Sequence, residues 1–304
     1  MEKIPHRQEF DSLLEKQEKE KEELKEKAHE EAIPMDENIN KYEETKKQIE
    51  EAIEVLGKED VLGPEAIKEA VDIELKPEEV PTIPFSKEDL EKAKELNQFL
   101  ILRVDADFNE KPITISKIQE MYKDEFGEFK FNAVGMLENA NKEDTTLNKN
   151  WALVSKEPIP GSEGEKYGKQ TELLVDYLTD KVFENKELPK EYKEAIDEIE
   201  ETFKPDKDGY ALMVGNEQFS NFKLNKLTRQ TPAEVLYDVL AYYKINKEPL
   251  LKDSKTWTSG YNKVSDEIYD IGRFNSDDKS VNINMHSHDW SPSKNAGVMF
   301  SRTL

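Results

Sequence analysis

The chain has 304 residues, of which 36% are hydrophobic, and its 44 Lys and Arg against 67 Asp and Glu give a formal net charge of −23. This excess of negative charge repels phosphate backbones and anionic lipid headgroups, so nucleic acid and membrane surfaces are poor expected partners. The absence of cysteine excludes disulfides, thiolate metal sites and a cysteine nucleophile. No secretory signal and no apolar run of membrane-spanning length is visible. We therefore expect a cytoplasmic protein, with a virion component as the open alternative.

Residues 1–85 are expected to form an acidic helical arm that ends in a linker. Residues 8–32 consist almost entirely of Glu, Lys, Gln and Leu, and residues 38–56 are a second helical run with a thicker apolar side. Pro64 suits the first turn of a third helix. Three prolines among acids then predict an extended linker over residues 75–85. We expect the arm to act as a solvated spacer, as a weak coiled coil for self-association, or as a tether to another component.

Residues 86–304 alternate strand and helix patterns, as expected for an α+β domain. Ser86 and Asp89 form a capping box that opens a short helix, and residues 231–234 form a second capping box before the most regular helix of the chain. Continuous apolar runs of strand length predict buried strands. The expected strands are residues 99–104, 150–155 and 210–215, and further helices are expected after a cap at Ser116 and over residues 167–183 and 189–203.

The segment 273–295 is crowded with Asn, Ser, Asp and His. Within it Val281, Ile283 and Met285 alternate with polar residues, so a strand here would pack one face on the domain. The other face would present Asn282, Asn284, His286 and His288. Together with Trp290 they form the mixture of adaptable polar groups and a rigid aromatic that recognition surfaces use. An ordinary solvated strand and loop is the plain alternative.

Enzymatic chemistry has little support in the sequence. No GxGxxG or GxxxxGK[ST] motif provides a phosphate cradle, and Ser287, His288 and Asp289 are adjacent, so an extended backbone points them to opposite faces. His286 and His288 would share one face of a strand and could both reach a metal. The candidate carboxylate ligands beside them are Asp277, Asp278 and Asp289. A metal-binding protein or metal-dependent enzyme is therefore the alternative to a recognition surface, although we expect no enzyme activity and no cofactor.

Three stretches of the sequence resemble a known family. They are "NWALVSKEPIPGSEGEKYGKQTELL" at 150–174, "TPAEVLYDVLAYYKINKEPLL" at 231–251 with "TWTSG" after it, and "AGVMFSRTL" at 296–304. In this order they resemble the variable proteins of diversity-generating retroelements, bacterial proteins with a C-type-lectin-like fold. The resemblance covers roughly the C-terminal two-thirds of the chain and leaves the acidic arm outside it.

The resemblance implies a compact α+β domain in which helices flank a small, twisted antiparallel sheet. A polar variable segment would precede a constant last strand. Adenine-directed mutation turns AAY Asn codons into Ser, Asp, His, Tyr or Gly codons, which accounts for most of the composition of residues 273–295. Lys279, Lys294, Met285 and Trp290 are not products of such codons. Related formylglycine-generating enzymes need cysteines, which this chain lacks.

The function that the resemblance implies is non-enzymatic binding of an unknown macromolecular ligand, most simply a protein, by a surface that can be diversified. The residues expected to contact that ligand are Asn275, Ser276, Asp277, Asp278, Asn282, Asn284, His286, His288, Asp289, Trp290 and Asn295.

Overall fold

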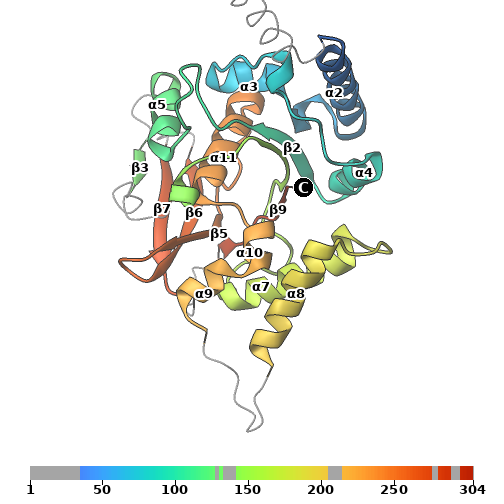
Figure 1. The fold of residues 1–304 in the computed structure, drawn as a ribbon. Coiled ribbons are helices and arrows are strands. Elements are labelled where there is room, and N and C mark those ends of the chain that lie inside the picture. Colours follow the sequence, from blue (N-terminus) through green and yellow to red (C-terminus); the bar gives the residue numbers. More distant parts are fainter. Residues whose placement is uncertain are drawn as a thin grey trace, which may run out of the picture.

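The structure is a computed structural model that describes residues 35–126, 130–132, 142–204, 214–275, 280–288 and 295–303. Within these residues the chain forms an α+β fold with two small sheets and helices packed around them (Figure 1). The α+β class expected from the sequence is confirmed. Both sheets contain parallel and antiparallel pairs, in contrast to the purely antiparallel sheet that was expected.

The first sheet has the strand order β1-β2-β4-β9. Its strands are β1 (Val61–Leu62), β2 (Gln98–Arg103), β4 (Asn150–Ser155) and β9 (Ser301–Arg302). β1 runs parallel to β2, whereas β2 and β4, and β4 and β9, are antiparallel. All 6 residues of β2 are buried, as its continuous apolar sequence predicts.

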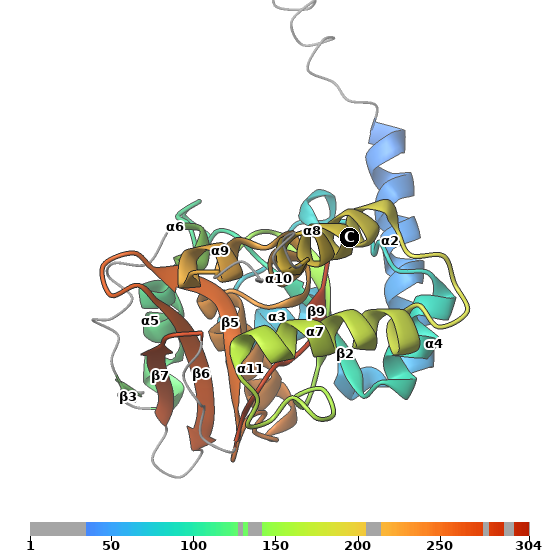
Figure 2. The ribbon, with the colours of Figure 1, turned by 90° about the horizontal axis from the view of Figure 1, so that it is seen from below.

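The second sheet has the order β3-β7-β6-β5-β8. Its strands are β3 (Lys130–Asn132), β5 (Lys255–Asn262), β6 (Glu267–Asn275), β7 (Ser280–His286) and β8 (Ala296–Gly297). The three longest strands, β5, β6 and β7, are antiparallel and lie side by side in Figure 2. Gly272 of β6 has φ +156°, and a Cβ there would collide with the backbone of Ser254 and Lys255. The close approach of β6 to the start of β5 therefore requires glycine.

The helices fall into an N-terminal and a C-terminal group. The first group is α2 (Met35–Leu56), α3 (Pro64–Val71), α4 (Lys87–Glu95), α5 (Ile115–Phe126) and α6 (Lys142–Thr145), with 3₁₀ turns at Lys58–Asp60 and Pro77–Glu79. The second is α7 (Tyr167–Tyr177), a π-helical turn (Leu178–Val182), α8 (Lys190–Phe203), α9 (Asn216–Asn221), α10 (Lys223–Thr228) and α11 (Pro232–Asn246). None of the helices in the described residues is long and apolar enough to cross a membrane.

Helix starts show which local predictions hold. The capping boxes of Ser86 and Thr231 are both formed, so the starts of α4 and α11 are confirmed. The predicted cap at Ser116 is wrong, because α5 begins at Ile115 and Thr114 Oγ1 accepts a hydrogen bond from the Lys117 N–H at 3.2 Å. The predicted strand at 210–215 lies mostly outside the described residues, and its last residues, Val214 and Gly215, lead into α9.

The N-terminal elements share one core with the rest of the domain. Ala52 of α2 and Ile67 of α3 are buried in the same apolar cluster as β2, β4 and α11. Residues 75–85, predicted as an extended linker, add Val80, Ile83 and Phe85 to this cluster. The linker segment therefore packs on the core. Residues 1–34, which include the charged run at 8–32, lie outside the described residues.

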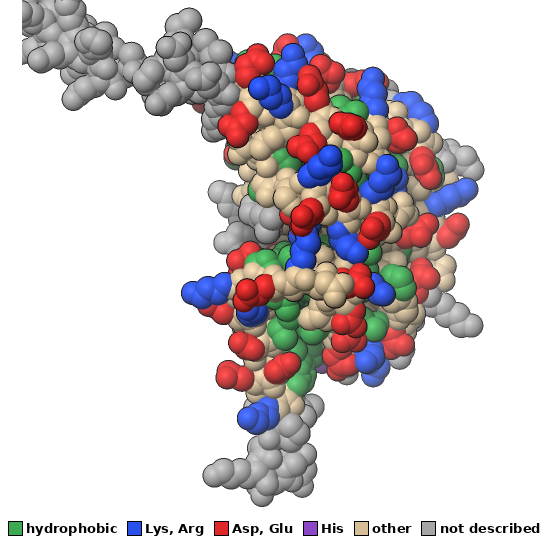
Figure 3. All heavy atoms as spheres, turned by 90° about the vertical axis from the view of Figure 1, so that its right-hand side faces the viewer, with side chains coloured by type: hydrophobic (Ala, Val, Ile, Leu, Met, Phe, Trp, Pro, Cys, Tyr) green, Lys and Arg blue, Asp and Glu red, His purple; other side chains and the backbone are tan. Residues whose placement is uncertain are grey.

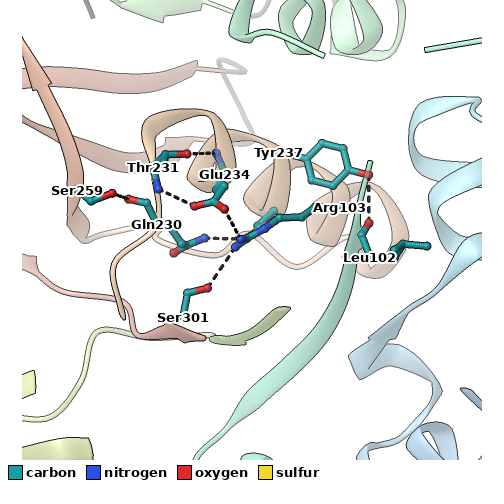
Figure 4. A network of polar contacts seen from close by, with 9 residues as sticks. Leu102, Arg103, Gln230, Thr231, Glu234, Tyr237, Ser259 and Ser301 are labelled. Atoms are coloured by element: carbon teal, nitrogen blue, oxygen red, sulfur yellow. Dashed lines mark hydrogen bonds and ion pairs between the residues drawn. The ribbon is translucent and has the colours of Figure 1, made fainter. Parts of the chain in front are cut away.

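A buried arginine joins β2, α11 and the last strand. Arg103 of β2 contacts both oxygens of Asp238 of α11, at 3.1 and 2.6 Å. It also contacts Glu234 at 2.6 Å (Figure 4). Its Nη2 also donates to Ser301 Oγ of β9 at 3.2 Å. Burial alone would lower the pKa of Arg103, but Asp238 and Glu234 raise it above its ordinary value. This charged, bidentate pair orients the helix that lies between the two sheets.

Candidate binding surface

Strand β7 separates core residues from polar residues by simple alternation. Val281 and Ile283 are buried in the core against α11 and β6, and Met285 packs against the same cluster. The alternate residues are half-buried on the opposite face: Asn282, Asn284 and His286. The predicted alternation is confirmed, with the difference that the polar face is partly covered and not freely exposed.

A carboxylate on the neighbouring strand organises this face. Asp270 of β6 is only 1% exposed and lies directly opposite Asn284 in the strand register. Asn284 Nδ2 donates to Asp270 Oδ1 at 2.8 Å, and Lys255 Nζ of β5 lies 3.1 Å from the same oxygen. His286 Nε2, from a diagonal position, lies 3.2 Å from Asp270 Oδ2. We refer to Lys255, Asp270, Asn282, Asn284 and His286 as the polar face.

The charge on Asp270 is stabilised by its neighbours. Burial raises the pKa of a carboxyl group, yet His286, Lys255 and Asn284 together lower the pKa of Asp270 below its ordinary value. The buried side chain is therefore ionised at neutral pH and acts as the fixed negative centre of the polar face.

Trp257 lies on the same side of the sheet as the polar face, because it is opposite Asp270 in the β5–β6 register. Trp257 of β5 is fully buried, and its ring centroid is 5.9 Å from that of His286 in an edge-on arrangement. Trp257 Nε1 has no hydrogen-bond partner among the described residues. The ring thus supports His286 by packing and not by a hydrogen bond.

His288 follows β7 and turns to a different partner. Its backbone N–H donates to Asn216 Oδ1 at 2.6 Å, and its ring Nδ1 lies 2.7 Å from the same oxygen. The ring also lies over Phe219 of α9, with the two centroids 4.5 Å apart. The predicted grouping of His288 with His286 is therefore only partial, since the two rings contact separate elements.

The remaining predicted contact residues are dispersed or not described. Asn275 is exposed at the end of β6, and Asn295 is exposed and donates from Nδ2 to the Asp253 carbonyl at 2.8 Å. The predicted residues outside the described ranges are Ser276, Asp277, Asp278, Asp289 and Trp290. The structure thus brings residues 282, 284 and 286 together, with His288 at their edge.

Sequence reasoning missed the supports of this surface. Lys255, Trp257 and Asp270 come from two other strands, and Asn216 comes from a helix that was not predicted. Polar residues within predicted strands were the only signal in the sequence for these supports. Such residues do not show which side chain they contact, because that depends on the register between strands.

The metal alternative receives no support from the described residues, where no group of three or more His, Asp or Glu side chains is arranged to hold a metal ion. The carboxylates predicted as further ligands, Asp277, Asp278 and Asp289, lie outside those residues. No family model, curated protein or solved structure matches the chain. The function is therefore inferred from the geometry of the polar face and from the sequence.

Proposed function

We propose that this chain is a non-enzymatic binding protein that presents the polar face, with the segments following β6 and β7, to a macromolecular ligand. The observation that carries the proposal is the alternation along β7. Val281 and Ile283 hold the strand to the core, while residues 282, 284 and 286 point to the other side. Side chains on that side can change without altering the apolar cluster that holds Val281 and Ile283, so recognition can vary while this part of the core is kept.

The size of the polar face indicates how a ligand would be held. β7 has 7 residues and so spans about 23 Å, and three neighbouring strands are about 14 Å wide. Lys255 and Asp270 are buried, so the accessible area is smaller than the resulting product of about 300 Å² and lies below the roughly 800 Å² that each partner of a stable protein complex buries. A protein ligand would therefore also contact residues 276–279 and 289–294, which follow β6 and β7 in the sequence and hold five of the predicted contact residues.

We further propose that the scaffold is C-type-lectin-like and that the surface is the diversified region of a retroelement variable protein. Two observations support this. β9 pairs antiparallel with β4, so the first and last stretches of the family resemblance meet in one sheet. Residues 296–302, expected to be constant, are all buried. A buried last strand together with a polar strand that can change is the division of roles that such a protein needs.

A paired library tests the proposed function. Codons 275, 282, 284, 286, 288 and 295 are randomised to Asn, Ser, Asp, His, Tyr and Gly, and the displayed proteins are selected against several unrelated purified proteins. The control library carries the same six residue types at Val281, Ile283 and Met285. We expect most members of the first library to resist protease and specific binders to be enriched from it, and most members of the control library to be cleaved. Equal protease sensitivity of the two libraries, or no enrichment from the first, would contradict the proposal.

The flanking DNA tests the retroelement part separately. A reverse-transcriptase gene and a near-copy of the last coding segment, differing from it at adenines, are expected beside this gene. Their absence would remove the diversification argument and leave only the binding proposal.

The metal-binding alternative makes a different prediction, which elemental analysis of the purified protein can check. It requires stoichiometric zinc or another transition metal that is lost in the His286→Ala, His288→Ala double variant. Our proposal expects the same metal content in the wild type and in the double variant.

A further inference from the structure

A cavity of about 640 Å³ lies between α2 and α3. The start of α3, residues between 75 and 80 and the end of α11 also contribute to its lining. We refer to it as the α2 groove, which is lined on the α2 side by Tyr42, Thr45, Lys46, Ile49, Glu50 and Ile53. α2 and β7 lie on opposite sides of the molecule in Figures 1 and 2, so the α2 groove is separate from the polar face.

Apolar side chains that the fold leaves partly uncovered gather at the α2 groove. In the described part of the chain, eight hydrophobic residues are only partly buried against the apolar cluster that holds β2, β4 and α11. Five of these eight line the groove: Ile49, Ile53, Ala66, Leu75 and Ile245. Tyr42, which is 38% exposed, lines it as well. Apolar surface that is collected at one place, and not scattered singly, marks an interaction site.

The α2 side of the groove has the spacing of a coiled-coil seam. Successive spacings of four, three and four residues connect the groove residues Tyr42, Lys46, Ile49 and Ile53. In the sequence the same spacing continues back to Ile39 and Met35. Ala52 and Val55 are buried on the adjacent side of the helix, which packs on its own domain. A helix with a heptad seam beside its buried side is suited to pack against a second helix.

The charges along the seam favour a second copy of α2 in antiparallel orientation. Lys46 and Glu50 are exposed, line the groove and lie one helical turn apart. A two-fold axis between positions 46 and 49 sets Lys46 of each copy beside Glu50 of the other. A parallel pair would instead place the two Lys46 side chains against each other. Acidic and basic side chains are mixed on the side of the molecule that carries α2 and α4, so a second copy meets no field of a single sign there (Figure 3).

The area of such a contact is sufficient for a reversible dimer. With the axis between positions 46 and 49, residues 39–56 of the two α2 helices overlap over about 27 Å. A groove with a helix on each wall is about 20 Å wide. Each copy would therefore bury about 500 Å², or about 1,000 Å² in total, which is near the lower limit for a specific interface. A dissociation constant on the order of 10 µM is expected for an interface of this size.

We propose that the α2 groove is the interface of a homodimer. The α2 helix of each copy lies in the groove of the other, antiparallel to that copy's α2, and the Lys46 side chain of each copy contacts Glu50 of the other. Because β7 lies on the opposite side of the molecule, both polar faces stay open in the dimer, and two sites on one ligand can be contacted at once. The dimer does not depend on the ligand-binding function of the polar face.

Sedimentation equilibrium of the full chain, between about 1 and 100 µM at pH 7 and about 0.15 M salt, tests this proposal. The mass should rise from the 35.3 kDa of one chain toward twice this value. Lys46→Glu should weaken association about tenfold, because each dimer contains two such ion pairs. Glu50→Lys should do the same, and the Lys46→Glu, Glu50→Lys double variant should return to within about threefold of the wild type.

The matched controls are Lys47→Glu and Glu51→Lys. These residues are exposed one position further along α2 and do not line the groove. Each control makes the same change of charge as its counterpart in the groove, so long-range repulsion between copies is altered equally. We expect the dissociation constants of both controls to equal that of the wild type.

Disulfide trapping reports the orientation of the two helices, because the chain contains no cysteine. The antiparallel seam places Tyr42 opposite Ile53 of the other copy. A mixture of Tyr42→Cys and Ile53→Cys chains should therefore form a disulfide-linked dimer, whereas neither variant alone should. The proposal is overturned if the chain stays monomeric up to about 100 µM, which would leave the groove to a small molecule or to another protein. It is also overturned if Lys46→Glu and Lys47→Glu act alike, or if Tyr42→Cys crosslinks alone, as a parallel pair would.

Discussion

Replacement of Asp270 by asparagine should destabilise the fold about twice as much as replacement of a polar side chain beside it. Asp270→Asn keeps the size of the side chain and removes the negative charge that Lys255 and His286 contact at 3.1 and 3.2 Å. The Lys255 side chain is only 11% exposed, so its ammonium group would be left nearly buried without a counter-ion.

The burial of Lys255 determines how strongly Asp270→Asn should destabilise the fold. Removing one partner of a buried ion pair destabilises a protein by about 3–5 kcal/mol. The long lysine side chain gives Lys255 some access to water, so we expect the lower end, about 3 kcal/mol. Asn284→Ala removes one hydrogen bond and leaves Asp270 with two partners, for which about 1–2 kcal/mol is expected. The loss of unfolding free energy in Asp270→Asn should therefore be about twice the loss in Asn284→Ala.

Urea unfolding at pH 7, followed by tryptophan fluorescence, measures these free energies. The control is Lys255→Met, alone and combined with Asp270→Asn. The double variant should be less destabilised than the sum of the single variants, because the lysine no longer needs its counter-ion. An Asp270→Asn variant within about 1 kcal/mol of the wild type, or strictly additive variants, would refute the reasoning.

The pH dependence has a definite sign. The pKa of Asp270 is lowered in the folded protein, so its contribution to stability is fully present above the unfolded pKa of about 3.9 and is lost as the pH falls through the folded value. The difference in stability between the wild type and Asp270→Asn should therefore shrink below about pH 4. If the difference in unfolding free energy between the two proteins stays constant from pH 7 to acid pH, the negative charge of Asp270 is not the cause of its stabilising effect.

Four further substitutions test the scaffold by urea unfolding. Gly272→Ala should destabilise by about 2–3 kcal/mol, because a Cβ collides with the start of β5; a loss below about 1 kcal/mol would contradict the required close approach. Arg103→Ala should destabilise by about 3–5 kcal/mol, since it leaves Asp238 buried without its cation, and a near-neutral effect would mean that water replaces the guanidinium. On β7, Ile283→Asn should destabilise by about 3 kcal/mol or more and Asn282→Ser by less than about 1 kcal/mol, and the opposite order would reverse the assignment of faces.

Local signals explain which parts of the fold could be predicted. Capping boxes join residues three positions apart, so Ser86 and Thr231 mark helix starts without knowledge of the tertiary structure. α9 and α10 have 6 residues each, too few for a helical period to be visible, and were missed. In residues 75–85 the prolines and acids suggested a linker, while spaced apolar residues such as Val80 and Ile83 were the overlooked signal of burial.

The candidate site could be predicted only along one strand. The period of two in β7 identified its polar residues because alternation is a property of neighbouring residues. Asp270, by contrast, is identified only by the register that sets it opposite Asn284, and the sequence spacing between β6 and β7 does not determine that register. Asn216 lies 72 residues from His288, a separation that no local pattern encodes.

The arrangement of supports gives the polar face its tolerance to change. The residues that hold it in place lie outside the segment 273–295: Asn216 on α9, Lys255 and Trp257 on β5, and Asp270 on β6. A substitution at 284 or 286 removes one of three partners of Asp270, and even both together leave Lys255 in contact. The buried carboxylate is then never left without a cation, the one outcome that would destabilise the fold severely. Changes within the segment can therefore alter what the surface contacts while each costs only about 1–2 kcal/mol of stability.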